Sequence, residues 1–270
     1  MHVPRAHSGL VASQSFTSHP SAPPPPMTEA TTPQDSNAGS KQVQSAVRPS
    51  ELVDAFVRVL LEQQPTSYLD IGCGSGALVE RLATHAIRTH GIEVTPTPAA
   101  LATGLVSAAD AHDLPFAAGS FDFVGFRHVP HHLPNLELAL SEAWRVCRHG
   151  LLLAEPWFEP SAPSQVLTAE LDGWLKVFER RRGRYHADAL SVADLMAVLP
   201  DASNCRAEML APMHPYLGVE LEQHMLEAIG ELELTADEEG LRALWLQRAN
   251  TGELTANGTL ILRVGKHSRD

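Results

Sequence analysis

Apolar residues recur along the chain with two different periods, and from residue 50 onward the two periods alternate. Positions 51–64 carry an apolar stripe at helical spacing, which begins after a candidate capping residue, Ser50, and ends at Pro65. Short apolar runs bounded by glycine, proline or polar residues predict buried strands. Five such strands are expected, at Ser67–Ile71, Thr89–Val94, Leu105–Ala109, Phe121–Phe126 and Gly150–Glu155.

Helical patterns separate these strands, at 77–84, 96–105 and 136–145, and the second is expected to start at a Thr95 cap with Pro96 in its first position. Parallel strands need crossover connections of this kind, so the pattern predicts an α/β fold with a doubly wound, mostly parallel sheet. After Pro156 the alternation breaks. Helices are expected within 157–190, at 191–199 and twice within 219–249, with strands at 204–210 and Thr259–Val264.

The domain organisation follows from composition. The first 49 of 270 residues hold the run Pro23–Pro26 and few large apolar residues, which is typical of a disordered tail, and translation could equally begin at Met1 or Met27. Residues 50–270 are then expected to form one domain, in which insertions at about 157–190 and 211–257 are candidates for a lid over the sheet.

Charge and cysteine usage narrow the class of protein. The chain has 20 basic and 32 acidic residues, a net charge of −12, and its one basic cluster, Arg180–Arg182 with Arg184, is interpreted as a solvated helix end. Nucleic acid is therefore disfavoured as a partner. No apolar run approaches a membrane span, and three cysteines without a CxxC pair suit a reducing, cytoplasmic location.

A glycine-rich turn follows the first predicted strand, at Gly72-Cys73-Gly74-Ser75-Gly76. In a doubly wound sheet ligands bind at this edge, where glycines let the backbone approach a ligand closely. The turn fits a dinucleotide fingerprint, read as Gly72-x-Gly74-x-x-Ala77, and also a different pattern, Gly72-x-Gly74-x-Gly76. Glu93, about 20 residues on, suits the ribose hydroxyls of either kind of ligand.

The sequence segments around the glycine turn distinguish between the dinucleotide fingerprint and the other glycine pattern. Asp110–Phe116, Gly119–Val124 and His131-His132-Leu133 follow the glycine turn and Glu93 in the chain. Together these segments resemble class I S-adenosylmethionine (SAM)-dependent methyltransferases, most closely the small-molecule branch called methyltransferase type 11. The resemblance runs from about Arg48 to Pro156 and implies a Rossmann-like, seven-stranded sheet. It further implies an enzyme that transfers the sulfonium methyl group of SAM to an O, N or C atom of a small molecule, leaving S-adenosylhomocysteine.

The same resemblance implies roles for individual residues. The cofactor-binding set that it implies is Asp70, Gly72, Gly74, Gly76, Glu93, Asp110, Ala111, Phe126 and Arg127. Among these, Asp70 is expected near the amino group of SAM, unless it caps the glycine turn instead. Glu93 is expected to hold the ribose diol, and Asp110 to accept from the adenine amine. Arg127 is unusual for the family at its position, and a cation there could bind the SAM carboxylate or an acidic substrate.

Catalysis by methyl transfer needs alignment of the acceptor and, for some acceptors, a base. His128 is the candidate base, because it follows the fourth strand, although a packed histidine is an equal alternative. His131 and His132 are expected to be structural, and no metal site is expected. Candidate residues for the acceptor pocket are Trp157, Tyr185, His186, His214 and Tyr216. Two alternatives to methyl transfer stay open, a SAM-binding module without turnover and a nucleotide-dependent oxidoreductase.

Overall fold

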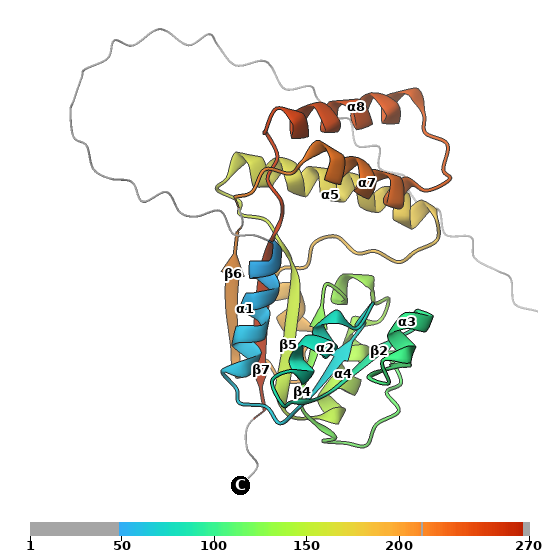
Figure 1. The fold of residues 1–270 in the computed structure, drawn as a ribbon. Coiled ribbons are helices and arrows are strands. Elements are labelled where there is room, and N and C mark those ends of the chain that lie inside the picture. The colour runs from blue at the N-terminus through green and yellow to red at the C-terminus, as the bar shows by residue number, and fades with distance from the viewer. Residues whose placement is uncertain (1–48, 212, 267–270) are drawn as a thin grey trace, which may run out of the picture. The chain divides into compact units, whose positions relative to one another are not determined.

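A computed structural model describes residues 49–211 and 213–266 of the chain. They contain a seven-stranded sheet in the order β3-β2-β1-β4-β5-β7-β6 (Figure 1). Strands β1 to β5 pair in parallel, and β7 is antiparallel to both of its neighbours. The strands are β1 Ser67–Ile71, β2 Arg88–Glu93, β3 Val106–Ala108, β4 Phe121–Arg127, β5 Cys147–Trp157, β6 Cys205–Leu210 and β7 Gly258–Gly265.

Helices cover both faces of the sheet because alternate strand residues point to opposite sides. On one face α1 (Pro49–Leu61) and α2 (Ala77–Ala83) pack against a set of buried strand residues that includes Tyr68, Phe123 and Leu152. The other face packs against α4 (Leu136–Val146) and α6 (Val192–Ala197) and buries the side chains that alternate with that set, Leu69, Val124, Phe126, Leu151 and Leu153. The short helix α3 is Pro98–Ala102, and the 3-10 turn η1 is Pro130–His132.

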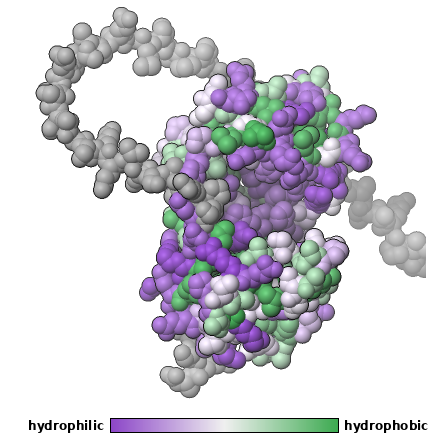
Figure 2. All heavy atoms as spheres, in the orientation of Figure 1, coloured by the Kyte–Doolittle hydropathy of each residue, from purple (hydrophilic) through white to green (hydrophobic). Residues whose placement is uncertain are grey.

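Three further helices form a separate group, which we call the α5–α7–α8 group. They are α5 (Pro163–Arg181), α7 (Gly218–Ile229) and α8 (Ala236–Asn250). Their buried side chains form a core of their own, around Leu175, Phe178, Met225 and Trp245. Figure 1 shows the group stacked beyond one end of the strands, and Figure 2 shows patches of hydrophobic side chains among hydrophilic ones on its surface.

None of the helices within residues 49–211 and 213–266 is long and apolar enough to cross a membrane. The α/β class and the doubly wound, mostly parallel sheet expected from the sequence are confirmed. The predicted tail, residues 1–49, lies outside the described residues apart from Pro49, the first residue of α1.

Some helices and strands begin or end at other residues than the sequence predicts. The helix expected at 96–105 is only Pro98–Ala102, and its cap is Thr97 rather than Thr95, because the Thr97 hydroxyl accepts from the Ala100 N–H and Pro98 takes the first position. The fifth strand is longer than expected, since β5 runs to Trp157 where it pairs with Gly258 of β7. Antiparallel pairing with a distant strand is not encoded in the local pattern of β5.

Candidate cofactor and acceptor site

The glycine turn joins β1 to α2 at the carboxyl edge of the sheet. Gly72, Gly74 and Gly76 all have positive φ angles, of 68°, 55° and 83°, a region that only glycine enters without strain. A side chain at Gly72 would also place its Cβ 2.4 Å from a Val129 methyl group. The turn can therefore lie against the loop after β4 only because residue 72 has no side chain.

Glu93, at the end of β2, fixes the shape of this turn. One carboxylate oxygen accepts from the Gly74 N–H at 3.0 Å, and the other accepts from the Val94 N–H at 3.0 Å. The N–H groups of Gly72 and Cys73 both donate to the Ile92 carbonyl. The carboxylate that sequence analysis assigned to a ribose is thus held rigidly at the carboxyl edge of the sheet.

Asp70 is buried below the turn, with 3% of its surface exposed. Burial raises the pKa of its carboxyl to about 7, although the charge of Arg127 and the hydrogen bond from the Tyr68 hydroxyl, at 3.2 Å, favour the carboxylate. Tyr68 reaches Asp70 across Gly125 of β4, where a Cβ would lie 2.0 Å from the Tyr68 oxygen. A buried carboxyl that is influenced by the charge of Arg127 therefore lies below the turn.

A cavity of about 530 Å³ opens above these residues. The ends of β1 and β2 and the loops after β3 and β4 supply most of its wall, through Gly72, Ile92, Glu93, Val94, Ala109, Ala111, Val129 and Leu133. His128, His132, Glu179 and Arg184 line it as well. The wall thus combines one strand-end carboxylate with several apolar side chains, as a nucleoside with a ribose diol and a flat base requires.

His128 lies between this cavity and a second one. It follows β4 with a positive φ of 57°, and its N–H donates to the Ala154 carbonyl at 2.7 Å. Burial, and then the charge of Arg127, lower the pKa of His128 to about 4, so that the imidazole is neutral at pH 7. A non-glycine residue in this backbone region is uncommon and costs about 1 kcal/mol or more, which the surrounding structure must offset.

The second cavity has a volume of about 300 Å³. Its apolar wall comes from α1, β5 and the segment before β7: Leu52, Val53, Phe56, Ala154 and Ala256. Five polar side chains, of Arg127, His128, His214, Asn257 and Thr259, also line it. Arg127 Nε and His214 Nε2 are buried and have no hydrogen-bond partner among the described residues. Two side chains that line the cavity therefore each hold a buried nitrogen atom without a hydrogen-bond partner among the described residues.

Four of the nine residues predicted to bind SAM line a cavity: Gly72, Glu93 and Ala111 line the larger one, and Arg127 lines the smaller one. The other five are not among the residues that line the two cavities: Asp70, Gly74, Gly76, Asp110 and Phe126. Asp110 is largely exposed, and its carboxylate accepts from the His112 N–H at 2.9 Å and pairs with His112 Nδ1 at 2.7 Å. Phe126 is fully buried in the core on the α4 face and is not among the residues that line the two cavities.

Of the five residues predicted for the acceptor pocket, His214 lines the smaller cavity. Tyr185 is 48% exposed, and Trp157 packs at the margin of the core. Tyr216 lines a separate pocket of about 30 Å³ and bonds His224 Nδ1 at 2.7 Å through its hydroxyl. His186 stacks on His131. The sequence missed Leu52, Phe56 and Asn257, because an apolar helix stripe and a polar turn carry no signal for a pocket.

The methyltransferase type 11 family model, described as a methyltransferase domain, matches residues 69–154. The chain is 33% identical over 154 residues to an ajmaline N-methyltransferase of Rauvolfia serpentina, covering 52% of this chain and 53% of that protein. It is 31% identical over 138 residues to a ubiquinone/menaquinone biosynthesis C-methyltransferase of Sinorhizobium fredii, covering 45% and 53%. The chain thus spans about half the length of these curated relatives.

The fold has solved counterparts. A structure of a putative methyltransferase from Bacillus halodurans C-125 superposes with a TM-score of 0.52 at 16% identity, covering 80% of this chain and 99% of that one. At this identity the likeness concerns the fold alone. The family match covers the strand ends and the glycine turn that form the larger cavity. Residues 69–154 of this chain therefore match a methyltransferase domain.

Proposed function

We propose that the protein binds SAM in the 530 Å³ cavity and transfers its methyl group to a small-molecule acceptor in the 300 Å³ cavity. The observation that carries this proposal is the position of His128, which lines both cavities at once. A methyl group must pass directly from donor to acceptor, so the two binding spaces have to share a wall at the reacting atoms.

The donor cavity suits SAM residue by residue. Glu93 is placed to accept from the ribose diol while its backbone hydrogen bonds hold it still. Ala109, Ala111 and Ile92 offer the adenine an apolar wall. Asp110, which lies between the two alanines in the chain, is the proposed acceptor for the adenine amine once it exchanges its His112 contact. SAM supplies an electrophilic methyl group on a sulfonium, which becomes the thioether S-adenosylhomocysteine after transfer.

The acceptor cavity favours an apolar molecule that carries a hydrogen-bond acceptor such as a carboxylate or a carbonyl. Arg127 Nε and His214 Nε2 are buried without a hydrogen-bond partner in the described parts of the chain, and both side chains line this cavity. A buried unpaired polar group costs about 1–3 kcal/mol, and an acceptor oxygen that satisfies Arg127 recovers it. The aliphatic and aromatic side chains of α1 exclude water from the rest of the cavity.

His128 serves as the base where the acceptor atom carries a proton. Its imidazole is neutral at pH 7, because burial and the charge of Arg127 lower its pKa to about 4. As the acceptor atom bonds to the methyl carbon that SAM would supply, its proton would pass to a His128 ring nitrogen. For an acceptor atom that carries no proton, His128 serves only as part of the wall between the two cavities.

Binding of SAM and of S-adenosylhomocysteine, measured by calorimetry on the full chain, tests the donor side. Glu93→Ala should weaken binding about 10- to 100-fold, because a charge-assisted hydrogen bond contributes about 1.5–3 kcal/mol. Glu80→Ala, on the exposed side of α2, is the matched control and should bind as the wild type does. Absence of binding at millimolar SAM rules out the proposal, and an unchanged affinity in Glu93→Ala rules out the ribose contact.

Turnover is tested separately, by incubating the protein with methyl-labelled SAM and a small-molecule extract. Label in an extracted compound supports an enzyme, whereas SAM binding without transfer to any fraction supports a binding module instead. We further propose a cytoplasmic location, which the three free cysteines favour. The α5–α7–α8 group is proposed as the lid of this site, since α5 contributes Glu179 to the donor cavity.

A further inference from the structure

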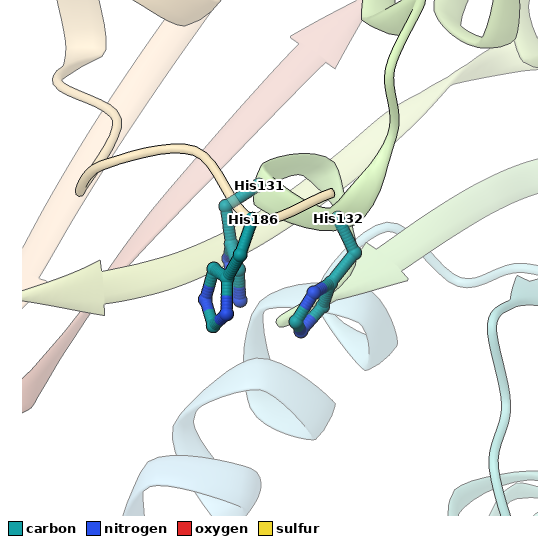
Figure 3. A group of neighbouring side chains, drawn as sticks. All are labelled: His131, His132 and His186. Carbon is teal, nitrogen blue, oxygen red and sulfur yellow. The ribbon is translucent and has the colours of Figure 1, made fainter. Parts of the chain in front are cut away.

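Three histidines meet beside the donor cavity, although they come from two distant parts of the chain. His131 and His132 lie in η1, and His186 lies in the segment after α5 (Figure 3). Each offers one ring nitrogen, and these nitrogens all lie within 4.8 Å of one another. The rings are packed closely, with centroids 4.2 Å apart for His131 and His132 and 4.3 Å apart for His132 and His186.

Carboxylates hold the outer nitrogens of two of these rings. His131 Nδ1 lies 2.6 Å from Glu155 Oε2, and His186 Nδ1 lies 2.8 Å from Glu179 Oε2. A histidine that binds a metal almost always gives its other ring nitrogen to a carboxylate or carbonyl, which fixes the tautomer and the ring orientation. In both pairs the Nε2 atom is the one left for a ligand.

The free nitrogen of His186 has no other explanation in the structure. His186 Nε2 is buried and has no hydrogen-bond partner among the described residues. Simple packing of neutral histidines would leave this atom unpaired at a cost of about 1–3 kcal/mol. A bound cation shared by the three rings satisfies it directly.

The buried cation of α5, Lys176, is paired with Asp172 at 2.6 Å, so its positive charge is compensated locally.

We propose that His131, His132 and His186 together bind one divalent transition-metal ion, with zinc as the preferred occupant. Imidazole nitrogen suits zinc, and three protein ligands are the usual number at a zinc site that keeps a fourth position open. His132 lines the donor cavity, so the proposed site lies beside that cavity. The ion also ties η1 to the segment after α5, which the Ala187 N–H already joins to the His131 carbonyl at 2.8 Å.

The test is zinc binding to the full chain after treatment with a chelator, followed by calorimetry. The wild type should bind one equivalent tightly, above weaker binding by the other 11 of the chain's 14 histidines. His186→Ala and His132→Ala should each lower the tight affinity more than 100-fold. His85→Ala, an exposed histidine after α2, is the matched control and should retain wild-type affinity.

Two further readouts separate a ligand role from a packing role. Glu179→Gln leaves all three rings in place, and its affinity for zinc should fall about 10- to 100-fold, as is usual when a carboxylate behind a ligand is lost. Zinc should raise the melting temperature of the wild type but not that of His186→Ala, whose chelator-treated form should still unfold cooperatively. Equal zinc affinity in wild type and His186→Ala, or a stoichiometric site that survives the His132→Ala change, overturns the proposal.

Discussion

The two cavities that meet at His128 are built in different ways. The donor cavity is formed largely by strand ends and the turns that follow them, and backbone hydrogen bonds such as that from Gly74 to Glu93 fix its shape. The acceptor cavity is formed by side chains from α1, β5 and the segment 256–259, which are far apart in the sequence. The shape of the donor cavity therefore depends on local backbone geometry, whereas the shape of the acceptor cavity depends on how distant segments of the chain pack together.

Their electrostatics differ in the same way. The donor cavity holds Glu93 in its wall, ready to accept hydrogen bonds, whereas the acceptor cavity holds the unpartnered nitrogens of Arg127 and His214. SAM brings hydroxyl and amino donors, so a carboxylate belongs on its side. The comparison predicts that substitutions in the turn affect SAM affinity, and that those at the junction affect transfer.

The largest effect is expected from Gly72→Ala. The new Cβ would lie 2.4 Å from a Val129 methyl group in a backbone region that disfavours side chains, so the turn must shift away from the donor cavity. We expect SAM affinity to fall more than 100-fold, measured by calorimetry. Gly119→Ala has a similar φ of 66° with open space around it and controls for backbone strain alone. If both variants bind SAM equally well, the turn does not shape the donor site.

His128→Asn should act on transfer instead of binding. Asparagine tolerates the positive φ of this position, so the backbone can stay in place while the base is lost. For an acceptor atom that carries a proton, the rate of label transfer from SAM should fall about 100-fold, as is typical for loss of general base catalysis. SAM affinity should change less than about threefold, because the lost group acts in transfer and not in SAM binding. A large loss of SAM affinity with normal transfer at saturation would place His128 on the donor side.

The difference between the two cavities also explains what could be predicted from the sequence. The sequence places the glycine turn and Glu93 at the ends of the first two strands, as the structure does, because strand, turn and strand lie within a short stretch of chain. The roles of these residues toward SAM stay predictions. The resemblance assigned Phe126 to SAM, and the structure places it within β4, where strand alternation buries it in the core beneath α4. His186 reaches His131 only through the course of the chain after α5, which no local period encodes.

The raised pKa of Asp70 predicts that the stability of the folded protein depends on pH. Burial raises its folded pKa to about 7, above the ordinary value of 3.8, so the folded protein keeps a proton that the unfolded chain has released. This contribution to stability is therefore lost as the pH rises from about 4 to 7. The Asp70→Asn variant has no carboxyl here and does not lose this contribution. The difference in free energy of unfolding, variant minus wild type, should therefore rise by about 2 kcal/mol between pH 5 and pH 8.

Urea denaturation of both proteins across this pH range measures the difference. Asp113→Asn, an exposed aspartate in the turn before β4, should follow the wild-type curve throughout and serves as the control. Parallel curves for Asp70→Asn and the wild type would mean that Arg127 and the Tyr68 hydroxyl stabilise the Asp70 carboxylate as well as water does.

The smallest effect is expected from Tyr185→Ala, a residue that its sequence context favoured as part of the acceptor pocket. Its side chain is 48% exposed and is not among the residues that line either cavity. Surface changes of this kind usually alter stability by less than about 0.5 kcal/mol, and label transfer should stay within about twofold of the wild type. His214→Ala is the informative partner, since its ring lines the acceptor cavity, and it should slow transfer at limiting acceptor. If Tyr185→Ala slows transfer as much as His214→Ala does, the acceptor extends beyond the 300 Å³ cavity toward the segment after α5.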